Sequence, residues 1–387
     1  MVKELDPTAI LAQLVSFPTV SRDSNLALVE WVEKYLAGHG ISSTRVPSED
    51  GQKAALYAQA GPAVPGGVIL SGHSDVVPVD GQVWTDDPFR LVERDGRLYG
   101  RGTCDMKGFV ALSIAALVAA ERRGVKRPLQ LALSYDEELG LTGCVPMIAE
   151  MAAKLPRAAA VIVGEPSLMQ VVSGHKGGVN FDVRIKGFEV HSSIAPQGVS
   201  AIHEAGRLLA WLNAENARLA RTPPAPLAAR FDPPFTTIHS GTIAGGTAAN
   251  ITAADCRMDM GFRVVPGEGI EDWIARLTAE VGRIEAGMKA VRPEAGITLI
   301  RRFIAPPLVP EEGGAAETLA RRLTGDNGDH VVSYGTEAGH FQSYGYSAVV
   351  CGPGSIAQAH QPDEWLARSE FDAGWTFMTQ LVEDLAA

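Results

Sequence analysis

Apolar residues in the first half of the chain follow two alternating spacings. Helical spacing is found in four segments: 10–15, 24–36, 109–120 and 145–154. Short apolar runs of strand length lie between them, at 68–70, 129–134 and 158–163. Strands that alternate with helices predict an α/β domain with a central, mostly parallel sheet flanked by helices.

The pattern changes near residue 178. Residues 179–185 and 256–264 alternate apolar and polar positions, which is typical of strands with one wet face. Together with further expected elements they give a β-α-β-β-α-β order, the ferredoxin-like arrangement. These elements are helices over 200–219 and 268–285 and strands over 235–243 and 297–303. We therefore predict a catalytic α/β domain of residues 1–177 and 305–387, with an inserted α+β domain over 178–304.

Composition limits the class of protein. Hydrophobic residues make up 46% of the 387 residues, enough for a substantial core, which excludes disorder as the main state. The net charge of -11 argues against a nucleic-acid partner. Four cysteines are too few for a disulfide scaffold, and none are close enough for a zinc ribbon.

No targeting or membrane segment is expected. The first six residues contain no apolar stretch of the kind found in secretory signals. The longest apolar run, 109–120, is too short to cross a bilayer and is better explained as a buried helix. We expect a cytoplasmic protein that does not bind membranes.

Carboxylates and histidines gather near the ends of the predicted buried strands. The clusters are Ser71–Asp75, Gly100–Gly108, Asp136–Glu138, Gly164–Pro166 and Ala359–Glu364. Ligands of open α/β sheets bind beyond the carboxyl ends of the strands, so parallel strands would bring the clusters to one edge. Two histidines and three or four carboxylates are a ligand set for a pair of Zn²⁺-like ions.

Each cluster also has a simpler explanation. A single histidine or aspartate at a strand end is more often a turn or cap residue. Asp105 could cap the following helix, and the pair Glu137-Glu138 could belong to a solvated loop. Five clusters at the ends of different elements favour the metal site over these separate explanations.

These clusters, in this order, resemble the motifs of the dinuclear-zinc aminoacylase/carboxypeptidase family. The resemblance spans nearly the whole chain. It implies a metal-dependent hydrolase of linear amides whose substrate is a small N-acyl amino acid. It also implies that the inserted domain is a lid through which a homodimer forms.

The resemblance carries roles onto single residues. Asp105 resembles the carboxylate that bridges two divalent ions, Zn²⁺ foremost, with Co²⁺ possible. His73 and Glu165 would hold one ion, and Glu138 and His360 the other. Asp75 resembles a carboxylate that orients the His73 ring. The family often has a cis peptide bond after the bridging aspartate.

Glu137 resembles the general base of the family. Two cations that share a water lower its pKa. Glu137 would accept the proton and return it to the departing amine. In the lid, His191 resembles the residue that stabilises the oxyanion, from the same chain or from the other subunit. Asn250 resembles a substrate contact, and Arg263 resembles the arginine that binds a substrate carboxylate.

Two further segments indicate which amino acid carries the acyl group in the substrate. Residues 172–178, with Lys176, and 334–341, with Thr336 and Glu337, resemble the branch that deacetylates acetylornithine in arginine biosynthesis. All three residues are expected at the substrate, and Glu337 could recognise the ornithine ammonium or only hold its loop. A desuccinylase of succinyl-diaminopimelate, a broader N-acyl-amino-acid hydrolase or dipeptidase, and a non-catalytic metal-binding module remain alternatives.

Overall fold

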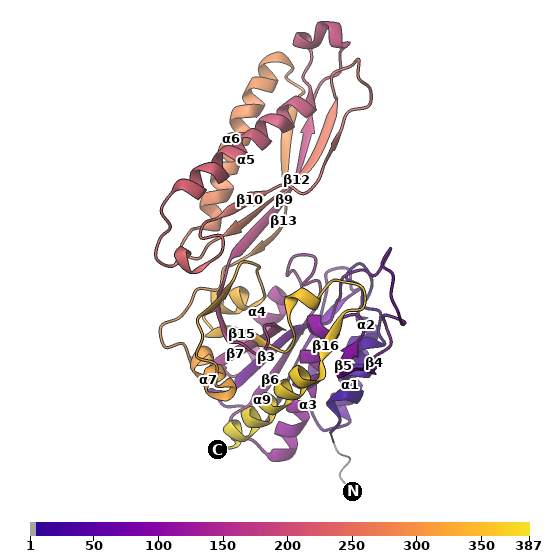
Figure 1. The fold of residues 1–387 in the computed structure, drawn as a ribbon, viewed down its shortest axis with the longest axis vertical. Coiled ribbons are helices and arrows are strands. Elements are labelled where there is room, and N and C mark those ends of the chain that lie inside the picture. The colour runs from indigo at the N-terminus through magenta and orange to yellow at the C-terminus, as the bar shows by residue number, and fades with distance from the viewer. Residues whose placement is uncertain (1–4) are drawn as a thin grey trace. The chain divides into compact units, whose positions relative to one another are not determined.

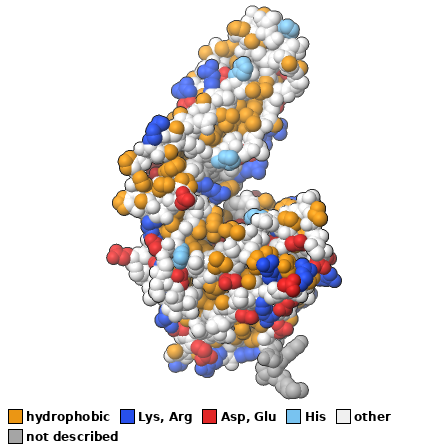
Figure 2. Space-filling view, in the orientation of Figure 1, with side chains coloured by type: hydrophobic (Ala, Val, Ile, Leu, Met, Phe, Trp, Pro, Cys, Tyr) orange, Lys and Arg blue, Asp and Glu red, His pale blue; other side chains and the backbone are white. Residues whose placement is uncertain are grey.

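The protein is described here by a computed structural model that covers residues 5–387. Two compact units make up this part of the chain. The first consists of the described chain up to Gly174 with Leu308–Val331 and Thr336–Ala387, and the second of His175–Pro307 with Val332–Gly335. The segment used to exclude a secretory signal starts with residues 1–4, which lie outside the described residues. Each unit has a separate hydrophobic core, and both show hydrophobic side chains mixed with charged ones on the surface (Figure 2).

An eight-stranded sheet is the centre of the first unit, in the order β1-β2-β6-β3-β7-β15-β8-β14 (Figure 1). The four central strands run parallel: β6 (Leu129–Ser134), β3 (Val68–His73), β7 (Ala160–Pro166) and β15 (Ala348–Gly352). The outer strands are β1 (Ser43–Pro47), β2 (Ala54–Ala60), β8 (Val172–His175) and β14 (His330–Val332). Of these, β1, β2 and β8 pair antiparallel to their neighbours. A small separate sheet contains β4 (Val92–Arg94), β5 (Arg97–Tyr99) and β16 (Trp365–Ala367).

Helices complete the first unit. They are α1 (Pro7–Val15), α2 (Leu26–Ala37), α3 (Gly108–Arg123), α4 (Cys144–Lys154), α7 (Ala315–Thr324), α8 (Ala338–Ser343) and α9 (Arg368–Ala386). Asp6 caps α1 by accepting hydrogen bonds from the amides of Thr8 and Ala9. α3 contacts α1 and α9. The stretch Thr103–Arg123 is long and apolar enough to cross a membrane, but 94% of its most apolar window is buried, so it is a core helix.

The second unit has the chain order β9 (Gly177–Lys186), α5 (Ala201–Arg221), β10 (Thr237–His239), β11 (Ile243–Gly245), β12 (Asp255–Val264), α6 (Ile270–Val291) and β13 (Gly296–Ala305). Its antiparallel sheet has the order β10-β12-β9-β13, and β11 pairs with β12. The alternating burial along β9 and β12 places every second side chain against α5 and α6. Apart from the short strand β11, this chain order of strands and helices is the β-α-β-β-α-β order of ferredoxin-like domains.

The predicted fold class is confirmed: a mixed, mostly parallel sheet flanked by helices, with a separate antiparallel sheet. Two differences have local causes. The predicted strand 235–243 is interrupted, because Asp259 binds the backbone amides of Gly241 and Thr242 and turns the chain there. β2 was missed because its sequence, Ala54–Ala60, is mostly alanine, which carries little strand signal.

Candidate metal centre

Three neighbouring strands bring the first predicted site residues together. β3 lies between β6 and β7 and runs parallel to both, so their carboxyl ends meet at one edge of the sheet. His73 is the last residue of β3, Glu165 is the sixth residue of β7, and the acidic loop 136–138 follows β6. All three strands are buried along their whole length, so the core fixes where these side chains emerge.

A glycine allows α3 to pack against β7 directly before Glu165. A Cβ atom at Gly164 would lie 1.9 Å from the ring of Phe109, which is 2% exposed. Any side chain at this position would therefore push α3 and β7 apart. The glycine keeps Glu165 close to the residues that the start of α3 carries.

Asp105 comes from that start, the segment Thr103–Lys107. The backbone leaves helical geometry at Asp105 and Met106, and the peptide bond between them is cis, as the resemblance implied. The side chain of Asp105 is 6% exposed. His360 reaches the same place from the loop after β15, and its side chain is half exposed.

Asp105 contacts a different histidine with each of its carboxylate oxygens. Oδ1 lies 3.1 Å from Nε2 of His73, and Oδ2 lies 3.2 Å from Nε2 of His360. Each histidine also meets a second carboxylate: His73 lies 3.9 Å from Glu165, and His360 lies 3.0 Å from Glu138. The cluster therefore has two halves that share one aspartate.

Glu137 lies in the same cluster. Its carboxylate, that of Glu165 and a ring nitrogen of His73 all lie within 4.8 Å of one another, and so do ligand atoms of His73, Asp105 and Glu138. Within residues 5–387, the Glu137 carboxylate makes no hydrogen bond or ion pair to another side chain. It is thus placed in the cluster but not held by a histidine.

The crowded acids shift one another's protonation. Burial, and then the charge of Glu165, raises the pKa of Glu137 well above its usual range, and burial with the charge of Asp105 does the same to the pKa of Glu165. Burial also acts on Asp105, but hydrogen bonds from His360 and His73 outweigh it and lower the pKa of this carboxyl. Hydrogen bonds to Asp105 and Glu138 raise the pKa of His360 to about 10. These shifts show that the cluster is crowded with negative charge, which a bound cation would offset.

The residues fit divalent ions by two further criteria. Oε1 of Glu165 is buried and has no hydrogen-bond partner among the described residues, an unusual condition for a carboxylate oxygen. The donors are imidazole nitrogens and carboxylate oxygens, which suit Zn²⁺ and related ions. Asp105 directs one carboxylate oxygen towards each half of the cluster.

Asp75 holds the cluster in a way that the sequence did not indicate. Nδ1 of His73 meets the backbone oxygen of Asp75 at 2.9 Å, whereas the Asp75 carboxylate is 3.6 Å away. That carboxylate accepts hydrogen bonds from Ser21 at 2.7 Å and from the amides of Glu137 and Glu138 at 3.2 and 3.4 Å. Asp75 therefore positions the acidic loop as well as the imidazole.

Arg101 and Glu364 are supporting residues that received no role from the sequence. One oxygen of Glu364 accepts hydrogen bonds from the amides of Cys104 and Asp105, at 2.9 and 3.1 Å, and the other pairs with Arg101. Both residues lie within motifs that were singled out. The sequence offered one signal for the pair: each of two motifs contains a charged residue with no assigned role, and the two charges are opposite in sign.

Glu337 and Thr336 also belong to the first unit. Glu337 is 1% exposed, and its carboxylate accepts hydrogen bonds from Ser71 and Ser134 near the ends of β3 and β6. The Thr336 hydroxyl accepts a hydrogen bond from the amide of Ala338 at 3.2 Å, at the start of α8. Glu337 thus lies beneath the strand ends that carry the cluster.

The other predicted site residues belong to the second unit. His191 and Asn250 are exposed and come together where the backbone of His191 pairs with that of Ile251. Arg263 is exposed on β12, opposite Gly178 of β9. Lys176 is buried and donates to the backbone oxygens of Pro233 and Phe235, at 2.7 and 2.9 Å.

Comparison with known proteins covers nearly the whole chain. The family model described as Peptidase family M20/M25/M40 matches residues 69–384. Acetylornithine deacetylase of Myxococcus xanthus is 36% identical over 375 residues, which is 92% of each chain. Acetylornithine deacetylase of Proteus mirabilis is 33% identical over 380 residues, covering 96% of this chain and 95% of that one.

Solved structures of low sequence identity share the fold. An M20 family metallo-carboxypeptidase from Sulfolobus solfataricus has a TM-score of 0.78 at 16% identity and covers 98% of this chain and 99% of its own. The YXEP protein of Bacillus subtilis, described as a dinuclear metal binding peptidase, has a TM-score of 0.66 at 16% identity, with 98% and 97% covered.

Proposed function

The chain belongs to peptidase family M20/M25/M40 and is a metal-dependent hydrolase, and from this premise we propose that it removes the acetyl group of N2-acetyl-L-ornithine to give L-ornithine and acetate. The substrate is supported by relatives named acetylornithine deacetylase at 33–36% identity over more than nine-tenths of the chain. In a cell this reaction would belong to arginine biosynthesis, and we place the enzyme in the cytoplasm.

The observation that carries the proposal is the shared position of Asp105 between two histidine–carboxylate pairs. We propose that His73 and Glu165 hold one divalent ion, that Glu138 and His360 hold the other, and that Asp105 contacts both. Zn²⁺ suits this donor set best, and Co²⁺ is an alternative. When bound, the ions would supply the Lewis acidity that activates water and polarises the amide carbonyl.

Proton transfer during hydrolysis requires a side chain of the protein. Glu137 lies within reach of the cluster, and its carboxylate is not held by a neighbouring side chain. We propose that it accepts the proton of the attacking water and delivers it to the leaving amine of ornithine. Asp75, through the amides of Glu137 and Glu138, keeps this carboxylate at the cluster.

We propose that residues 178–304 form a lid and the contact of a homodimer. His191 would donate a hydrogen bond to the developing oxyanion, from its own chain or from the second subunit. Arg263 would bind the substrate carboxylate with its guanidinium, and Asn250 would contact the substrate beside it. Lys176, Thr336 and Glu337 would contribute to the substrate site; the side chains of Lys176 and Glu337 are buried within their own units.

A hydrolysis panel tests the substrate directly. The metal-loaded protein is given acetylornithine, succinyl-diaminopimelate and acetylmethionine in turn, each with Zn²⁺ and with Co²⁺. We expect the highest kcat/KM for acetylornithine. A higher kcat/KM for succinyl-diaminopimelate would show that the protein is a desuccinylase and not a deacetylase. Equal values for all three substrates would indicate a broad N-acyl-amino-acid hydrolase.

A further inference from the structure

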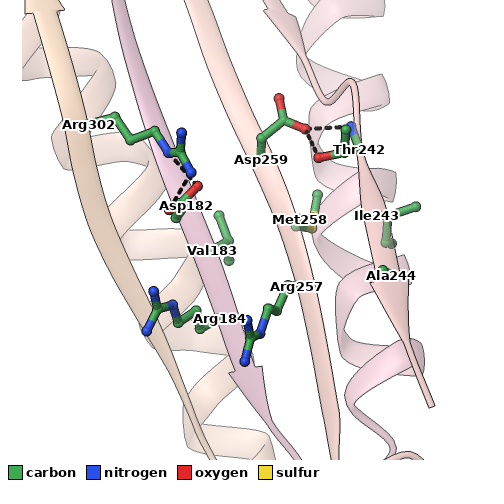
Figure 3. Close-up of a pocket in the computed structure, with 10 residues that line it drawn as sticks. All are labelled: Asp182, Val183, Arg184, Thr242, Ile243, Ala244, Arg257, Met258, Asp259 and Arg302. Carbon is green, nitrogen blue, oxygen red and sulfur yellow. Dashed lines mark hydrogen bonds and ion pairs between the residues drawn. The ribbon is translucent and has the colours of Figure 1, made fainter. Parts of the chain in front are cut away.

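The sheet of the second unit carries a hollow that the proposed hydrolysis does not use. It lies on the face that α5 and α6 do not cover, has a volume of about 340 Å³, and is lined by residues of β9, β11, β12 and β13 (Figure 3). Val183 and Met258 belong to the core on the helix side. The residues that alternate with them, Asp182, Arg184 and Arg257, project to the open face.

Strand register places like charges opposite each other in this hollow. On the antiparallel strands β9 and β12, Asp259 pairs with Asp182, and two residues away Arg257 pairs with Arg184. Like charges directly opposite on a sheet repel each other and are destabilising. Figure 3 shows the two arginine side chains next to each other at one end of the hollow.

The two aspartates are each compensated by the protein. Asp182 accepts hydrogen bonds from two nitrogens of Arg302, at 2.6 and 2.9 Å. Asp259 accepts from the Gly241 amide at 2.9 Å and from the Thr242 hydroxyl at 2.9 Å. Their repulsion is therefore offset within the second unit.

The two arginines are not compensated. Across residues 5–387, neither the Arg184 nor the Arg257 guanidinium makes a hydrogen bond or an ion pair with a protein group. Both are exposed, and the apolar side chain of Ile243, 50% exposed, forms a wall of the same hollow. The hollow thus combines two unneutralised guanidinium groups with an apolar side.

We propose that Arg184 and Arg257 form a binding site for a small organic oxyanion. A planar guanidinium donates two parallel hydrogen bonds to a carboxylate or a phosphate, and two guanidinium groups side by side suit a dianion. The volume is in the range of small-molecule sites. The ligand is a dicarboxylate or a phosphate monoester whose short carbon chain contacts Ile243.

The experiment uses the metal-loaded, full-length protein with inorganic phosphate and succinate as probes. Binding is measured by calorimetry and melting temperature for the unaltered chain, for Arg184→Gln/Arg257→Gln and for Arg221→Gln. Arg221 is an exposed arginine at the end of α5, outside the hollow, so its variant loses charge from the same unit without touching the site. Any binding of the probes at the metal cluster is common to all three proteins.

We expect at least one probe to bind the unaltered chain saturably, and the double variant to lose at least tenfold in affinity while Arg221→Gln keeps it. Without probe, the single variant Arg184→Gln should melt about 1–2 °C higher, because it removes the repulsion. Tighter binding of phosphate identifies the ligand as a phosphate monoester, and tighter binding of succinate as a dicarboxylate. Undiminished affinity in the double variant, or an equal loss in Arg221→Gln, would overturn the site.

Discussion

The guanidinium of Arg101 lies 2.7 Å from the carboxylate of Glu364, and both side chains are 1% exposed. The second Glu364 oxygen accepts a hydrogen bond from the backbone amide of Asp105. Because both charges are buried, neither can be removed without leaving the other uncompensated. The position of Asp105 between His73 and His360 therefore depends on this buried ion pair.

Glu364→Gln should lower the free energy of unfolding by about 3–5 kcal/mol, the usual cost of breaking a buried pair. Urea denaturation measures this directly. Glu383→Gln is the matched control, since it breaks the exposed pair with Arg123 and should change stability very little. Equal effects of the two substitutions would show that burial of the Arg101–Glu364 pair has no energetic weight.

Glu137→Gln should separate chemistry from metal binding. We expect kcat to fall roughly 10²–10⁴-fold, because a proton acceptor is lost, while two ions per chain remain bound. Elemental analysis of the purified variant measures the metal. The comparison variant is Glu138→Gln, which should lose metal along with activity. If Glu137→Gln also loses an ion, Glu137 is a ligand rather than the base.

Removal of the metal should abolish hydrolysis and lower the melting temperature. Ions that bind the folded state and not the unfolded chain stabilise the fold by mass action, and the clustered carboxylates repel one another without them. Dialysis against a strong chelator, followed by addition of Zn²⁺ or Co²⁺, should restore both properties. Full activity of a chelated sample that contains no measurable metal would exclude the proposed mechanism.

His340 should make stability depend on pH between 6.5 and 4. Burial lowers the pKa of this ring from 6.5 to about 4, so the unfolded chain binds the proton first as the pH falls. The stability is fully present above 6.5 and is lost as the pH drops towards 4, by about 3 kcal/mol in total. Urea denaturation of the unaltered chain and of His340→Gln isolates this contribution as the difference between their pH profiles. Parallel profiles would contradict it.

Glu337→Gln tests the recognition of the ornithine ammonium. We expect kcat/KM to fall several-fold more for acetylornithine than for acetylmethionine, because a negative charge beneath the site is removed. The serine hydroxyls of Ser71 and Ser134 donate to different oxygens of Glu337. In the glutamine variant the amide oxygen can retain one of these hydrogen bonds, and the amide NH2 can donate to the other hydroxyl. An equal fall for both substrates would mean that Glu337 only supports the strand ends.

Much of the candidate site could be predicted because the place where a strand ends is visible in the local sequence. His73, Glu165 and the acidic loop 136–138 were each placed at the end of an apolar run, and parallel pairing of β6, β3 and β7 brings such ends together. The two long helices of the second unit were also predicted, although both extend further, to Arg221 and Val291.

Contacts between residues distant in the chain were not predictable in the same way. The Arg101–Glu364 pair joins positions 263 residues apart, and no periodicity relates them. The sequence marked Asp75 as a partner of His73, but its hydrogen bonds from the amides of Glu137 and Glu138 depend on how the loop after β6 turns. Backbone donors carry no signature in a sequence, so such roles appear only in three dimensions.

The side chains of the clustered acids and imidazoles come from the first unit, while the second has its own core. The chain passes between the units at Gly174–His175, at Pro307–Leu308 and at both ends of Val332–Gly335. Evolution can therefore exchange or remodel one module while the other keeps its internal packing. A chimaera that receives residues 175–307 and 332–335 from a relative should therefore keep the packing around the clustered acids and imidazoles of the first unit.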